Sequence, residues 1–173
     1  MLPPDDFDPE IGTPETPEPG LRRIVAPNPS PMTYRGTNTY LLGESEIAVV
    51  DPGPESDAHL QAILDALTPG QRITHIIVTH THLDHSPLAR PLSERTGAPI
   101  HAFGDAEAGR SAIMGDLDQS GMLGGGDGVD HHFAPANRLA DGDRMKGAGW
   151  AVGVHQPPGH SGNQHRRDPG AGR

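Results

Sequence analysis

The chain has 173 residues, a formal net charge of −10 and no cysteine, and it contains 23 glycines and 19 prolines. A chain of this length can bury the core of one domain, but a hydrophobic fraction of only 33% predicts that part of it lies outside that core. The absence of cysteine excludes disulfides, cysteine-type zinc fingers and thiol nucleophiles. The acidic charge disfavours general binding to nucleic acid, although it does not exclude binding through a local basic groove.

The N-terminal segment is acidic and rich in proline. Residues 1–20 hold six prolines and six acidic residues, with no Lys or Arg. Such a segment buries too little apolar area to offset the entropy of ordering it, so we expect a disordered tail. The segment has neither the basic nor the apolar region of a secretory signal, and the chain has no apolar run of about 18 residues. We therefore expect a cytoplasmic protein without a membrane segment.

Residue patterns predict an α/β domain that begins at about residue 21. The expected strands cover residues 21–26, 37–42, 46–50, 73–78 and 99–103, with weaker candidates at 138–140 and 150–152. A helix should lie between the third and fourth of these strands, which favours a βαβ unit with parallel pairing.

Two helices are expected between the strands. Ser56 should cap the first, which leaves His59 on an exposed turn. The apolar stripe of this helix is Leu60, Ile63, Leu64 and Leu67. Ser86 and Pro87 should begin the second helix, and Gly97 sits where such a helix should end.

Four side chains able to bind a metal follow the apolar run 73–78 within six residues. They are His80, His82, Asp84 and His85. Residues two apart in an extended segment project to the same side, so His80 and His82 can face one ion. Leu83 should turn into the structure, and the next two side chains can face a second position. Imidazole and carboxylate without thiolate suit Zn, Fe or Mn, with zinc as the first expectation. Chance clustering of histidines is the alternative, and the density of donors disfavours it.

The segment 80–85 is similar to the His-x-His-x-Asp-His signature of the metallo-β-lactamase fold superfamily. Residues 38–42 resemble the strand that opens the family domain, and residues 49–53 resemble its first motif. Residues 158–160 resemble the element that supplies a third His. The residue pattern of these motifs is most similar to that of lactamase-beta-like and glyoxalase-II-like hydrolases. The matches span about residues 21–164. The resemblance implies that these residues form an incomplete α/β domain of the αββα metallo-β-lactamase type, of which this chain would hold the N-terminal half to two-thirds.

The resemblance also implies roles for individual residues. The implied metal ligands are His80, His82 and His160 for one ion, and Asp84 and His85 for a second. Asp51 would orient the ligand loop, because a ligating imidazole needs an acceptor for its other N–H. A metal-bound hydroxide would attack an ester, thioester, lactone or phosphodiester, and Asp84 would also guide the proton. The acidic charge favours a small acyl substrate over RNA.

The C-terminal part departs from the family pattern. The family site has a bridging Asp and a final His well downstream of the third His, whereas this chain ends thirteen residues after His160. Pro157 also replaces the usual Thr. We expect a C-terminally truncated domain whose second metal site is incomplete. Residues 165–173 should be unstructured, and their composition is that of an out-of-frame reading of a GC-rich gene. Reading the other two frames of the gene past codon 160 tests this.

Two other interpretations stay open. One is a non-catalytic fragment that holds a partial metal site. The other is an iron-dependent oxidoreductase on the same fold, such as a persulfide dioxygenase. His131 and His132 follow the glycine-rich stretch 115–130 and are weak candidates for contact with substrate. The oligomeric state has no signature in the sequence.

Overall fold

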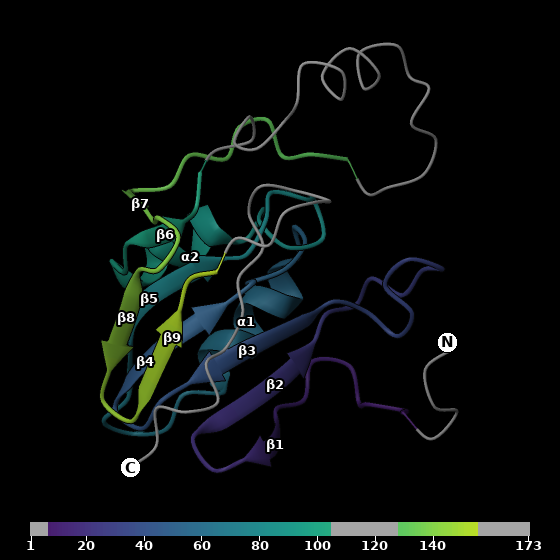
Figure 1. The fold of residues 1–173 in the computed structure, drawn as a ribbon. Coiled ribbons are helices and arrows are strands. Elements are labelled where there is room, and N and C mark those ends of the chain that lie inside the picture. The colour runs from purple at the N-terminus through teal and green to yellow at the C-terminus, as the bar shows by residue number, and fades with distance from the viewer. Residues whose placement is uncertain (1–6, 105–127, 156–173) are drawn as a thin grey trace.

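The computed structural model describes residues 7–104 and 128–155, which form one large sheet, two helices and a separate hairpin (Figure 1). The strands of the sheet are, in spatial order, β1 (Glu15–Glu18), β2 (Leu21–Val25), β3 (Asn38–Leu42), β4 (Glu46–Val50), β5 (Arg72–Val78), β6 (Ile100–Ala102) and β7 (Asn137–Arg138). The helices are α1 (Asp57–Asp65) and α2 (Ala89–Thr96), and the hairpin comprises β8 (Arg144–Gly147) and β9 (Trp150–Gly153).

The sheet changes from antiparallel to parallel pairing at β4. Strands β1 to β4 pair antiparallel with their neighbours, whereas β4 to β7 pair parallel. Val49 lies opposite Ile76 and Val50 opposite Ile77, and α1 connects these two strands. The predicted βαβ unit is therefore confirmed. Because β4 and β5 run in the same direction, the loops that follow them meet at one edge of the sheet.

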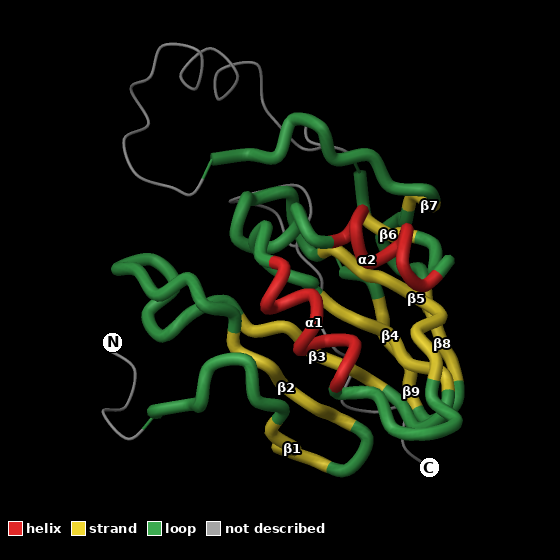
Figure 2. The backbone as a smooth tube through the Cα atoms, turned by 180° about the vertical axis from the view of Figure 1, so that it is seen from behind, coloured by secondary structure: helices red, strands yellow, loops and turns green. Residues whose placement is uncertain are grey.

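The two faces of the sheet bury different amounts of apolar surface. Both helices lie on one face (Figure 2), where α1 contributes the buried Leu60 and Ile63, and alternate residues of the central strands meet them. The hairpin β8–β9 lies on the other face (Figure 1) over a smaller cluster. That cluster consists of Leu42, Ala48, Ile77, Trp150 and Val152. The Trp150 indole N–H donates to the Glu46 carbonyl at 2.8 Å, which fixes the hairpin to the first residue of β4.

The ends of the helices follow the predictions in part. Ser56 caps α1, since its hydroxyl accepts from the His59 backbone N–H at 3.2 Å. Gly97 ends α2 in the left-handed conformation with φ of 74°. Ser86 is not the cap of α2, because the cap position is two residues later, at Leu88. Its hydroxyl oxygen instead lies 3.2 Å from the His82 carbonyl oxygen, within the metal-ligand loop.

Three expectations from the sequence were wrong. Residues 15–18 of the expected tail form β1, because Glu15 pairs with Arg23 of β2. His59 is 1% exposed, since it lies beside Leu60 on the buried side of α1. Leu83 is 45% exposed and does not enter the core. No helix of the described residues is both long and apolar enough to cross a membrane.

Candidate metal centre

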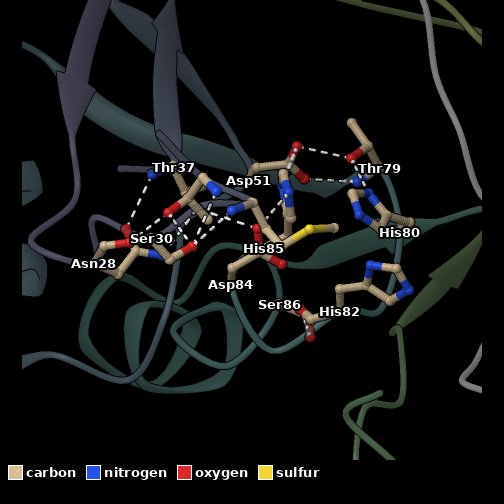
Figure 3. A network of polar contacts seen from close by, with 12 residues as sticks. Asn28, Ser30, Thr37, Asp51, Thr79, His80, His82, Asp84, His85 and Ser86 are labelled. Atoms are coloured by element: carbon tan, nitrogen blue, oxygen red, sulfur yellow. Dashed lines mark hydrogen bonds and ion pairs between the residues drawn. The ribbon is translucent and has the colours of Figure 1, made fainter. Parts of the chain in front are cut away.

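The loops after β4 and β5 are joined by backbone hydrogen bonds. The Asp51 N–H donates to the Ile77 carbonyl at 2.8 Å, and the Gly53 N–H donates to the His85 carbonyl at 3.0 Å. Leu88, which precedes α2, donates its N–H to the Gly53 carbonyl at 3.2 Å. The loop 51–53 is thus held against residues 77–88 along its whole length. The side chains of both loops meet in the network that Figure 3 shows.

Three of the predicted ligands come together in this network. One nitrogen of His80, one nitrogen of His82 and one carboxylate oxygen of Asp84 all lie within 4.8 Å of one another. All three residues are partly buried, and the rings of the two histidines point toward the same space (Figure 3). His80 and His82 follow β5 at alternate positions and face one space, as the spacing predicted. Asp84, predicted to face a second position with His85, lies in the turn that follows and joins the two histidines in one group. Their role as ligands remains a prediction.

Asp51 contacts the residues on both sides of this group. Its carboxylate accepts from the Thr79 N–H at 2.8 Å and from the Thr79 hydroxyl at 2.7 Å. Its Oδ2 also lies 3.0 Å from Nδ1 of His85. The Asp51 backbone has φ of 49°, a left-handed conformation that costs a non-glycine residue about 1–2 kcal/mol. The hydrogen bonds of this aspartate offset that strain.

The hydrogen bonds of Thr79 select one tautomer of His80. The Thr79 hydroxyl proton goes to Asp51, so its oxygen is left to accept from Nδ1–H of His80 at 3.0 Å. Nε2 of His80 then carries a free lone pair. Burial, the charge of His85 and the neighbouring His82 lower the pKa of His80 to about 4, against the carboxylates that raise it. His80 is therefore neutral at pH 7, as metal ligation requires.

His85 is in the opposite electrostatic state. Burial lowers its pKa, but the hydrogen bonds and charges of Asp51 and Asp84 outweigh burial and raise this pKa to about 10. Nε2 of His85 lies 3.1 Å from Oδ2 of Asp84. Burial disfavours ionisation of Asp84, yet the hydrogen bond and charge of His85 leave its pKa below the usual value. The raised pKa favours the imidazolium form of His85, which lies between the two carboxylates and beside His80, with 4.1 Å between the two ring centroids.

The sequence matches the metallo-beta-lactamase superfamily over residues 32–166, which is more than half of the chain. The chain belongs to this superfamily. A beta-lactamase domain protein from Burkholderia ambifaria is 25% identical, with a TM-score of 0.67 over 93% of this chain and 52% of that one. The α/β fold of the metallo-β-lactamase type is therefore confirmed.

Two curated relatives carry different names. The beta-lactamase-like protein 2 homolog of Caenorhabditis elegans is 41% identical over 68 residues, which cover 38% of this chain and 23% of the relative. The atrochrysone carboxyl ACP thioesterase of Aspergillus fumigatus is 32% identical over 147 residues, which cover 83% of this chain and 39% of the relative. The chain thus spans well under half of these relatives and about half of the Burkholderia protein.

The donor set fits the metal ion that the superfamily typically binds. Two imidazoles and one carboxylate are the ligand types of zinc and of other first-row metals in sites without thiolates. His80 is neutral, and Asp84 is ionised well below pH 7. Three protein ligands leave room for a further ligand, as in catalytic metal sites. The predicted third histidine, His160, lies outside the described residues, as does the turn at residues 157–159.

Two further groups at the site were missed from the sequence. The Thr37 hydroxyl donates to Oδ2 of Asp84 at 3.2 Å, and Asn28 brackets Thr37 through both ends of its side-chain amide at 2.9–3.0 Å. Asp130 accepts from the Ser86 hydroxyl at 3.1 Å, and its N–H donates to the Thr81 carbonyl at 2.7 Å. Asn28 and Asp130 lie far from the ligand motif along the chain. The sequence signal for Asn28 is its position shortly after the strand 21–25, and Asp130 has no comparable local signal.

The two weak candidates, His131 and His132, follow Asp130 directly. Both are exposed, and the His132 N–H donates to the Asp130 carboxylate at 3.1 Å. Residues 128–130 run beside the ligand loop, because Leu83 donates its N–H to the Gly128 carbonyl at 2.8 Å. This places the backbone of the two histidines near the site, and contact with a substrate remains a prediction.

Proposed function

We propose that this chain carries the metal-binding part of a zinc-dependent hydrolase that acts on thioesters or related acyl esters. The observation that carries the proposal is the cluster of His80, His82 and Asp84 within 4.8 Å, with a neutral His80 whose Nε2 is free. His160 would complete the first set of ligands. A bound ion would activate water and polarise the acyl carbonyl. Because the chain spans about half of its solved relative, its own activity is part of the proposal.

Each of the described residues would have a defined task. His80 and His82 would hold the ion, and Thr79 would hold His80 in the required tautomer. Asp84 would hold the ion and accept the proton of the attacking water, since it is ionised and its Oδ2 is oriented by Thr37. His85 would join as a ligand of a second ion only after losing its proton, which its raised pKa opposes.

Three observations support an acyl substrate over a phosphodiester. The thioesterase of Aspergillus fumigatus aligns over most of this chain. The net charge of −10 repels a polyanion. Leu83 is 45% exposed in the middle of the ligand loop, where it can contact an apolar acyl chain. Together they favour an acyl substrate over a phosphodiester.

Metal analysis and hydrolysis by the purified chain test the proposal. We expect bound zinc and cleavage of an acyl thioester, both lost in His82→Ala. His155→Ala, which removes an exposed histidine, is the matched control and should keep both. A wild-type chain that binds no zinc would overturn the metal site. Faster cleavage of a phosphodiester than of a thioester would overturn the substrate class, and bound iron with oxygen uptake would assign an oxidoreductase.

A further inference from the structure

The buried histidine of α1 is a titratable group that the proposed mechanism does not use. His59 is 1% exposed and lies on the same side of α1 as Leu60 and Ile63. Burial lowers its pKa to about 4, so the ring is neutral at pH 7. A polar ring inside an apolar core needs a hydrogen bond to offset its desolvation. Among the described residues, its side-chain hydrogen-bond partner is Thr39 of β3, whose hydroxyl oxygen lies 2.8 Å from Nε2.

The direction of this hydrogen bond follows from the proton of Thr39. The Thr39 hydroxyl donates to the Asp51 carbonyl at 2.7 Å, so its single proton is already used. Nε2 of His59 must therefore carry a proton and donate it to the Thr39 oxygen. Nδ1 of His59 is then unprotonated, and it is buried without a hydrogen-bond partner. The result is a series of two hydrogen bonds, from the His59 ring to the Thr39 hydroxyl and from that hydroxyl to the Asp51 carbonyl.

This series of hydrogen bonds ends at Asp51, which contacts the candidate metal centre. Two hydrogen bonds hold the left-handed backbone of Asp51. Its N–H donates to the Ile77 carbonyl, and its carbonyl accepts from the Thr39 hydroxyl. Its carboxylate then reaches Thr79 and His85. A change at the carbonyl would rotate this short loop and move the carboxylate with it.

Gly53 indicates that the His59 ring must lie close to the loop. Gly53 has φ of 100°, and a Cβ added there would lie 3.0 Å from Cδ2 of the ring. The loop backbone therefore leaves no space for a side chain between itself and His59. Simple filling of a core would not require this close approach or the hydrogen bond.

We propose that His59 is a positioning residue for the metal centre, acting through the Thr39 hydroxyl on the backbone of Asp51. The inference rests on the metal site proposed above. It assigns to the buried face of α1 a control over metal affinity, although none of its side chains is a predicted ligand. The alternative is that His59 only fills volume in the core.

Paired substitutions separate the two roles. His59→Leu keeps much of the volume and removes the donor, whereas His59→Gln keeps an N–H donor near the position of Nε2. Thr39→Val removes the hydroxyl, and Thr39→Ser restores it. Ile63→Val is the control for loosened packing of α1, because Ile63 is fully buried and lies outside the hydrogen-bond chain.

Zinc affinity, measured by competition with a chromophoric chelator, is the main readout. We expect a loss of roughly 10-fold for His59→Leu and for Thr39→Val, the low end for losing a group that orients a ligand. His59→Gln and Thr39→Ser should stay within about 3-fold of the wild type. The double variant His59→Leu/Thr39→Val should be no weaker than either single variant, since both break one chain. Ile63→Val should leave the affinity unchanged.

The outcomes distinguish this inference from the proposed function. If the wild-type chain binds no zinc, the metal site itself fails. If the wild-type chain binds zinc, and the zinc affinity of His59→Leu equals that of the wild type or of Ile63→Val, the positioning role fails. Nitrogen NMR of the metal-free chain gives a second test, which expects the Nε2–H tautomer of His59. An Nδ1–H tautomer in the wild type would overturn the inference without any metal.

Discussion

The loop after β4 and the loop after β5 lie side by side but differ in burial. Residues 51–53 are all buried, and each of the two loop ends makes backbone hydrogen bonds to the other loop. The loop after β5 carries four of the five predicted ligands, and all four are partly exposed. A metal centre that meets substrate needs such exposure. The candidate ligands therefore lie on the more exposed loop, while Asp51 of the buried loop contacts Thr79 and His85 beside them.

Removing the carboxylate of the buried loop should have the largest effect. Asp51→Asn takes one partner from the imidazolium of His85 and an acceptor from Thr79. Breaking a largely buried pair should lower the free energy of unfolding by about 3 kcal/mol. Zinc affinity should fall roughly 10–100-fold. Urea unfolding and chelator competition measure the two effects. Asp65→Asn at the end of α1 is the control, and an equal effect there would refute a special role for Asp51.

Acid should lower the free energy of unfolding through the buried ring of His59. Its folded pKa of about 4 lies below the ordinary 6.5, so the unfolded state binds more protons between these values. Stability is present above pH 6.5 and is lost as the pH falls toward 4, by about 3 kcal/mol. His80 adds to the same loss, whereas the contribution of His85 is lost as the pH rises from 6.5 toward 10. Thermal unfolding of the metal-free chain measures this. His59→Gln should flatten the acid limb, and an unchanged limb would contradict the assignment.

Cutting the link between the loops should affect metal more than folding. Thr79→Val removes the hydroxyl that joins Asp51 to Nδ1 of His80. Zinc affinity should fall roughly 10-fold because the His80 ring loses its fixed tautomer. Thr79→Ser keeps the hydroxyl and should bind zinc like the wild type. Equal affinity of the Val and Ser variants in chelator competition would show that the link has no role.

Two glycines with similar backbones test the close approach of the loop to α1. Gly53 and Gly70 have φ of 100° and 88°, but a Cβ at Gly70 would meet no atom within 4 Å. Gly70→Ala should cost about 1 kcal/mol from its backbone alone, and Gly53→Ala about 2 kcal/mol or more because it also meets His59. Urea unfolding measures both. Equal losses would show that the ring yields freely.

The smallest effect on stability should come from the exposed loop. Leu83→Ala changes a side chain that is 45% exposed, so the free energy of unfolding should shift by no more than about 0.5 kcal/mol. Leu60→Ala, at a buried position of α1, should cost about 2–5 kcal/mol. If Leu83 contacts an acyl chain, its substitution should raise the KM for longer acyl thioesters and leave that for acetyl thioesters unchanged. A uniform change would remove Leu83 from the substrate site.

Local patterns predicted most of the fold and the donor set. The strands at Leu21–Val25, Glu46–Val50 and Arg72–Val78 follow from β-branched apolar runs, and α1 follows from its apolar stripe and the Ser56 cap. β1 was not predictable in this way. Its stability comes from pairing with Arg23 and β2, and no local propensity of Glu15–Glu18 records that partner.

The sequence by itself predicted the set of candidate metal ligands, because His80 and His82 at alternate positions after a strand project to one side and Asp84 and His85 follow in the next turn. Only the tertiary structure decided the protonation of each histidine. His80 and His85 are five residues apart, yet burial makes one neutral while two carboxylates make the other cationic. Only the fold could place His59 inside the core and link it to Asp51, since hydrogen bonds and desolvation depend on neighbours that the chain brings from distant positions.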